Sequence, residues 1–171
     1  MDAELNDMES RPSPVQAVTA QNCAASLLVA GHAGIRCVQW KVAKRPEDVE
    51  PPCILLPNAG QTDSSYAVHS LRSAASQWRS ATQNGTRAAL SVKENGKLRA
   101  MKSIVGVTTS EHYDMAWQVW QAFQIPLVTI WYLDHEDGPQ FLSLDPLPLH
   151  ELTERELRLF EEVSQRPMSQ S

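Results

Sequence analysis

The sequence predicts an α+β domain, built as a small mixed sheet with flanking helices, and three central features carry that prediction. Asn95-Gly96 is typical of a tight hairpin turn, because both residues tolerate positive φ. Thr108 and Glu111 form a capping box that would begin a helix, and apolar residues at helical spacing follow it. The apolar run Leu127–Leu133 then predicts a strand covered on both faces.

The remaining elements follow from local signals along the chain. Pro14 suits the first turn of a helix that would stop at Gly31. A second helix is expected from a cap at Thr62 or Asp63 to about Gln83. Besides 127–133, strands are predicted at 35–43, 53–56, 89–93, 98–104 and 140–144.

The expected domain organisation is one domain with short tails. Thr153 and Glu156 make a second capping box, which predicts a short C-terminal helix to about Val163. The predicted divisions are a disordered tail at 1–13, the domain at 14–149, a docking helix at 150–165 and a tail at 166–171.

Composition is typical of a cytoplasmic protein. The chain of 171 residues is long enough for one core, and no run of 18 apolar residues predicts membrane insertion. The acidic start MDAELNDMES lacks the pattern of an export signal. Three cysteines in apolar contexts make a disulfide framework improbable, and no C-x-x-C or His/Cys spacing indicates zinc. The acidic turn at 134–137 could hold a divalent ion, but consecutive turn residues rarely converge on one point, so no metal site is expected.

Charge is divided along the chain, although the net charge is only −5. Seven basic residues and one acid lie between Arg72 and Lys102, whereas eleven acids and two arginines lie between Glu111 and Glu162. Two solvated faces would explain this division. The alternative is a basic face for phosphate or nucleic acid opposite an acidic face for a basic protein partner.

The predicted start of the central helix is the first candidate site, because free N–H groups there can bind an anion. His112 would act as phosphate ligand or general acid/base, and Glu111 would share the catalytic role; an exposed His and a capping Glu are the alternatives. The phosphate-binding set would comprise the hydroxyls of Thr108, Thr109 and Ser110 and the cations Arg99 and Lys102. The basic hairpin and the helix start would enclose one shared pocket.

The run of elements over roughly residues 50–133 resembles the ParB/sulfiredoxin superfamily. The matching features are the hairpin SVKENGKLRAMK, the glycine Gly106, the helix start SEHYDMAW and the strand IPLVTIWY. Gly106 thereby joins the expected phosphate-binding residues. The G-x-T-T-x-x-H run and the helix WQVWQAF resemble the plasmid fertility inhibition branch, of the Osa/FiwA type. Tyr113 stands where that superfamily has a phosphate-binding arginine, and tyrosine lacks the permanent charge.

The resemblance implies a ParB/sulfiredoxin-like fold and a protein that blocks conjugative DNA transfer. It implies ATPase or nuclease activity with ATP and Mg²⁺ as cofactors. The implied partners are the type IV secretion or coupling machinery or the transferred DNA. The alternative function is a catalytically empty interaction module whose acidic C-terminal half binds a basic partner.

Overall fold

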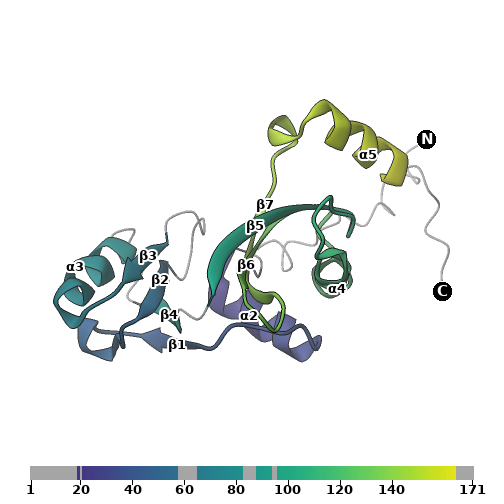
Figure 1. Ribbon diagram of the computed structural model, residues 1–171. Coiled ribbons are helices and arrows are strands. Elements are labelled where there is room, and N and C mark those ends of the chain that lie inside the picture. The colour runs from purple at the N-terminus through teal and green to yellow at the C-terminus, as the bar shows by residue number, and fades with distance from the viewer. Residues whose placement is uncertain (1–18, 20, 58–64, 83–87, 94–95, 165–171) are drawn as a thin grey trace, which may run out of the picture.

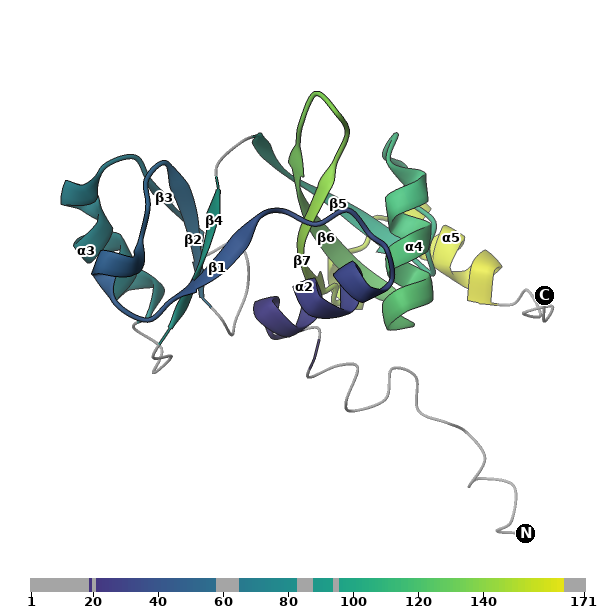
Figure 2. The same ribbon diagram turned by 90° about the horizontal axis from the view of Figure 1, so that it is seen from below.

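The computed structural model describes residues 19, 21–57, 65–82, 88–93 and 96–164 (Figures 1 and 2). Two antiparallel sheets lie next to each other, and helices pack against each of them. The predicted tails at 1–13 and 166–171 and the predicted caps Thr62 and Asp63 lie outside the described residues. No helix within these described ranges has both the length and the apolar character needed to cross a membrane.

The first sheet has four strands in the order β1-β4-β2-β3. Its strands are β1 (Trp40–Ala43), β2 (Cys53–Pro57), β3 (Tyr66–Val68) and β4 (Ala89–Lys93), with the 3-10 turn η1 (Pro46–Asp48) after β1. Helix α3 (Leu71–Ala81) covers one face of this sheet (Figure 1). Ala74 and Ala81 face the sheet, and their small side chains let the helix lie close to Leu55 and Val68.

The second sheet has three strands, β5 (Lys97–Ile104), β6 (Leu127–Asp134) and β7 (Gln140–Pro146), in that order. Helices α2 (Cys23–His32) and α4 (Tyr113–Phe123) pack on one face of it (Figure 2). The rings of Phe123 on α4 and Phe141 on β7 stack at 6.1 Å between centroids. Apolar residues at every second position of β6 point to this face.

One hydrophobic cluster connects the two sheets. It takes Leu56, Leu90 and Val92 from the first sheet and Ile130 and Leu144 from the second, all at most 1 % exposed. Helix α5 (Glu154–Ser164) lies outside this cluster, after the 3-10 turn η3 (Leu149–Glu151). The segment around α5 packs through a separate small cluster, whose buried members are Ile104, Leu147 and Leu152.

The predicted hairpin around Asn95-Gly96 is wrong. Strand β4 pairs with β1 and β2, whereas β5 pairs with β6, so the segment between them links two sheets. The expected single mixed sheet is also wrong, since both sheets are purely antiparallel, although the α+β class holds. A turn motif sets only local geometry, and the buried faces of β4 and β5 find their partners elsewhere.

Three helix boundaries also differ from the prediction. Helix α4 begins at Tyr113 with His112 as its N-cap, because the hydroxyl of Thr108 accepts a hydrogen bond from Ser110 N (3.2 Å) and forms no capping box. Helix α3 begins after Ser70, and the short strand β3 precedes it. Helix α2 runs past Gly31 to His32.

The strands are closer to expectation. The predictions at 53–56, 89–93, 98–104, 127–133 and 140–144 each agree with an observed strand within two residues at either end. The strand predicted at 35–43 is confined to β1, because Arg36 and Val38 bond instead to the backbone of Phe141 on β7 (2.8 and 3.0 Å). The capping box of Thr153 and Glu156 is confirmed.

Candidate functional site

The loop between β5 and α4 is held by the backbone itself. Ile104 and Val107 exchange two hydrogen bonds of 2.8 and 2.9 Å across the turn. Val105 and Gly106 inside that turn have φ of 50° and 79°. Gly106 lies against the indole rings of α4, where a Cβ would meet Trp117 at 2.8 Å. The position of Gly106 is therefore explained by packing.

Four predicted site residues meet around the end of β6. His112, with 16 % of its side chain exposed, places Nε2 3.8 Å from Glu111 Oε1 and 4.0 Å from Asp134 Oδ1. Asp134 also lies 3.7 Å from Arg99 Nε. The group consists of Arg99, Ser110, Glu111, His112, Tyr132 and Asp134. It combines an acid-base side chain with carboxylates and a cation, which is the chemistry expected at a proton-transfer site.

Tyr132 forms the floor of this group. Its ring meets the His112 imidazole edge-on, with centroids 5.1 Å apart. Burial raises the pKa of Tyr132, and the carboxylates of Asp134 and Glu111 raise it further. A hydrogen bond with the side chain of Ser110 and the charge of Arg99 oppose that rise in pKa. The phenol therefore stays protonated at neutral pH.

Lys102 belongs to a second group on the opposite face of the sheet. Its Nζ donates to the carbonyl of Glu151 (2.7 Å) and to Glu156 Oε2 (3.2 Å). Residues three apart on a strand point to opposite faces, so Arg99 and Lys102 cannot serve one pocket. Hydrogen bonds from Thr153, together with Lys102, hold the pKa of Glu156 below its usual value.

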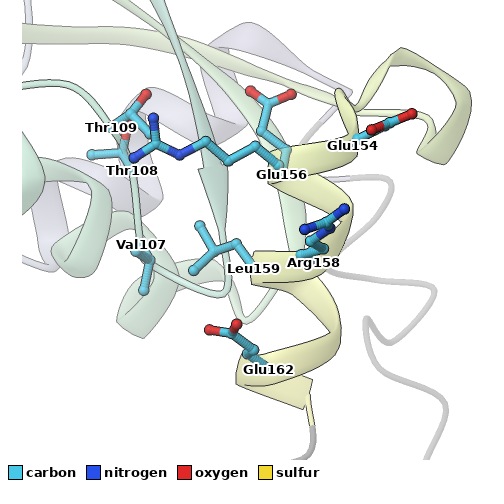
Figure 3. Close-up of a pocket in the computed structure, with 9 residues that line it drawn as sticks. Val107, Thr108, Thr109, Glu154, Glu156, Arg158, Leu159 and Glu162 are labelled. Carbon is cyan, nitrogen blue, oxygen red and sulfur yellow. The ribbon is translucent and has the colours of Figure 1, made fainter.

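Thr108 and Thr109 line a pocket of about 540 Å³ between the β5–α4 loop and α5 (Figure 3). Figure 3 shows Leu159 projecting from α5 toward the loop, with Glu162 one turn further along. The complete lining is Val107, Thr108, Thr109, Glu154, Arg155, Glu156, Arg158, Leu159 and Glu162. The predicted basic residues are not among them, so the pocket joins the loop to the acidic C-terminal helix.

A polar row crosses the face of the second sheet that α2 and α4 leave uncovered. Lys102 pairs in register with Thr129, and Thr129 pairs with Asp145. Side chains directly opposite on antiparallel strands have Cβ atoms about 5 Å apart. Trp131 lies two residues after Thr129 on β6 and therefore on the same face of the sheet, and its Nε1 donates a hydrogen bond to Asp145 Oδ2 at 2.7 Å.

Sequence reasoning missed three members of these groups: Thr129, Tyr132 and Asp145. Alternation along β6 separates Thr129 and Trp131 from buried Val128 and Ile130, and that alternation was the available signal. Within the described residues, no group of three or more His, Cys, Asp or Glu side chains is arranged to hold a metal ion.

No protein-family model and no curated protein matches the chain. Solved structures do match. The D-alanine-D-alanine ligase from Helicobacter pylori aligns with TM-score 0.65 at 10 % identity, over 90 % of this chain and 60 % of that one. The RimK domain ATP-grasp protein from Sphaerobacter thermophilus aligns with TM-score 0.62 at 15 % identity, over 84 % and 63 %.

A third match is the biotin carboxylase from Campylobacter jejuni in complex with β,γ-ATP, with TM-score 0.62 at 13 % identity over 87 % and 44 %. A biotin carboxylase domain from Hydrogenobacter thermophilus that also matches was solved with MgADP. The chain spans 44–63 % of the length of the first three structures named here. At these identities the likeness establishes the fold, and that fold is of the ATP-grasp type.

This finding overturns the expected ParB/sulfiredoxin-like fold and the fertility-inhibition branch within it. The inhibition of plasmid conjugation that was inferred from that branch is wrong with it. The expected resemblance rested on the local order of elements, and that order leaves the pairing of the strands open. ATP and Mg²⁺, the expected cofactors, are the ligand types named for the matched complexes.

Proposed function

We propose that this chain is an adenine-nucleotide-binding module of the ATP-grasp type that takes part in ATP-dependent ligation. The observation that carries the proposal is the alignment of 84–90 % of the chain with three ATP-grasp structures. Two matched proteins are complexes with β,γ-ATP and MgADP, and several are ligases.

The polar row on the second sheet is the place where this chain can hold the phosphates. Lys102 supplies an ammonium group, and Thr129 supplies a hydroxyl beside it. Trp131 on the same face offers a partly buried indole for the base. These groups lie on adjacent strands whose register fixes their spacing.

Mg²⁺ fits this row only as an ion carried by the nucleotide. Mg²⁺ is commonly held by one or two protein carboxylates together with substrate phosphates. Asp145 is the carboxylate that pairs with Thr129, and within the described residues no larger group of metal-binding side chains exists. Bound there, Mg²⁺ would neutralise phosphate charge beside Asp145.

Binding of ATP with Mg²⁺, measured by isothermal titration calorimetry, tests the proposal. Lys102→Ala removes a charged hydrogen-bond donor and should weaken binding by about 10- to 100-fold. Lys97→Ala is the matched control, because it removes the same charge from the opposite face of β5 and should leave affinity within about twofold.

The outcomes separate the function from the site. Failure of the wild-type chain to bind ATP, with or without Mg²⁺, would reject the proposed function. ATP binding that Lys102→Ala leaves unchanged, or that both variants weaken equally, would reject the polar row and keep the module.

A further inference from the structure

The cation that the proposed function assigns to phosphate is already in contact with a carboxylate of the same chain. Lys102 Nζ lies 3.2 Å from Glu156 Oε2 and donates to the Glu151 carbonyl at 2.7 Å. Both side chains are shielded, with 35 % of Lys102 and 17 % of Glu156 exposed. A phosphate that reached Lys102 would take the position of this carboxylate.

The start of α5 does not depend on the ion pair between Glu156 and Lys102. Glu156 Oε2 also accepts hydrogen bonds from Thr153 Oγ1 (2.9 Å) and Thr153 N (2.8 Å), and the bond from Thr153 N belongs to the capping box. These bonds lie within the helix start and remain when Lys102 leaves. Helix α5 can therefore part from β5 without losing its N-terminal cap.

Helix α5 makes few apolar contacts with the rest of the described chain. The helix itself contributes only the partly buried Leu159 and Phe160 to the small cluster with Ile104, Leu147 and Leu152. The 540 Å³ pocket lies between α5 and the β5–α4 loop, so that side of the helix is not closely packed (Figure 3). Among the described residues, Arg155 and Arg158 line this pocket without an ion-pair partner.

We propose that Glu156 is a built-in competitor for the phosphate end of the nucleotide, and that α5 moves off Lys102 when nucleotide binds. The proposal rests on the proposed function and adds its regulation. In the free protein the Glu156 carboxylate neutralises Lys102. In the bound protein the phosphate replaces the Glu156 carboxylate at Lys102, and the pocket lined by Thr108 and Thr109 widens as α5 moves away.

Glu156→Gln tests the competition directly. Glutamine keeps the size of the side chain and can still complete the capping box, so the substitution removes only the negative charge that faces Lys102. Loss of this partly shielded ion pair should tighten ATP binding by about two- to five-fold. Glu162→Gln is the matched control, since Glu162 lies on the same helix and lines the same pocket without contacting Lys102 in the described chain.

Hydrogen exchange in the wild-type chain gives a second readout that needs no variant. Saturating ATP should speed exchange of the α5 amides while those of α4 exchange at an unchanged or slower rate. Exchange in α5 that slows or stays constant at saturation overturns the proposal. So does a Glu156→Gln variant that binds no more tightly than Glu162→Gln.

Inorganic triphosphate separates this proposal from the proposed function. If ATP fails to bind but triphosphate binds, Glu156→Gln should still increase the affinity for triphosphate, and adding Lys102→Ala should abolish that increase. This result would support competition by Glu156 for phosphate while rejecting the proposed nucleotide binding. If neither probe binds more tightly to Glu156→Gln, the competitor role is wrong.

Discussion

Gly106 adopts a backbone conformation that would be strained for a residue with a Cβ atom. Its φ of 79° lies in the left-handed region, and the preceding Val105, a β-branched residue, has φ of 50°. A Cβ on Gly106 would also approach Trp117 Cε3 and Trp120 Cβ to 2.8 and 2.9 Å. Backbone strain and overlap with α4 act together at this residue.

Gly106→Ala should therefore destabilise the protein by about 2–3 kcal/mol, measured by urea unfolding. Gly31→Ala is the opposite case, because a Cβ at Gly31 meets nothing within 4 Å and the residue is helical. That control should be neutral or stabilising by up to about 1 kcal/mol. Equal effects of the two substitutions would contradict the account of the turn.

Arg99 and Lys102 show how residue spacing decides the site. They are three apart on β5, so the two side chains leave opposite faces of the sheet, toward Asp134 and toward Glu156. The expected pocket shared by both cations is divided for this reason. Because side chains alternate between the two faces of a strand, the sequence alone already placed Arg99 and Lys102 on opposite faces of β5.

At the scale of elements, α5 is the helix whose attachment depends most on charge. It follows a capping box and adds few buried apolar residues, so Glu156 links it to the sheet through Lys102. The folded-state pKa of Glu156 lies below its usual value of 4.5. A depressed carboxyl pKa contributes stability above the unfolded value, and that stability is lost as the pH falls through the folded value.

Acid should therefore loosen α5 before the rest of the molecule. As the pH falls below 4.5 and through the lower folded-state pKa of Glu156, the NMR amide signals of α5 should move toward random-coil positions while those of α4 stay in place. In Glu156→Gln position 156 no longer titrates, so the α5 signals should not show this movement toward random-coil positions. An identical pH transition in this variant would show that another group controls the helix.

At the scale of the whole molecule, the two sheets share a core. Leu56, Leu90 and Val92 from one sheet belong to the same buried cluster as Ile130 and Leu144 from the other. Helix α2 contributes Leu27 to that cluster, and the chain passes directly from α2 to β1. Burial of one continuous cluster predicts one cooperative unfolding transition.

Leu90→Ala should lower the free energy of unfolding by about 2–5 kcal/mol in both sheets at once. Native-state hydrogen exchange of the slowest amides in β4 and β6 measures this. Retention of wild-type protection in β6 would show instead that the two sheets unfold as separate units.

Local signals in the sequence determined where most strands lie and where α5 begins. Each of these features depends on residues within a few positions of one another, as with Thr153 and Glu156. The cap expected from Thr108 failed because Ser110, only two residues away, competes for the same hydroxyl.

Only the tertiary structure decided which strands pair, and with that the class of fold. The periodicity of apolar residues in β4 and β5 is compatible with several partner strands. Burial in the shared core selects β1 and β2 as the partners of β4, and β6 as the partner of β5. The polar row of Lys102, Thr129 and Asp145 exists only after that selection. Its members lie up to 43 positions apart in the chain and become neighbours through strand register alone.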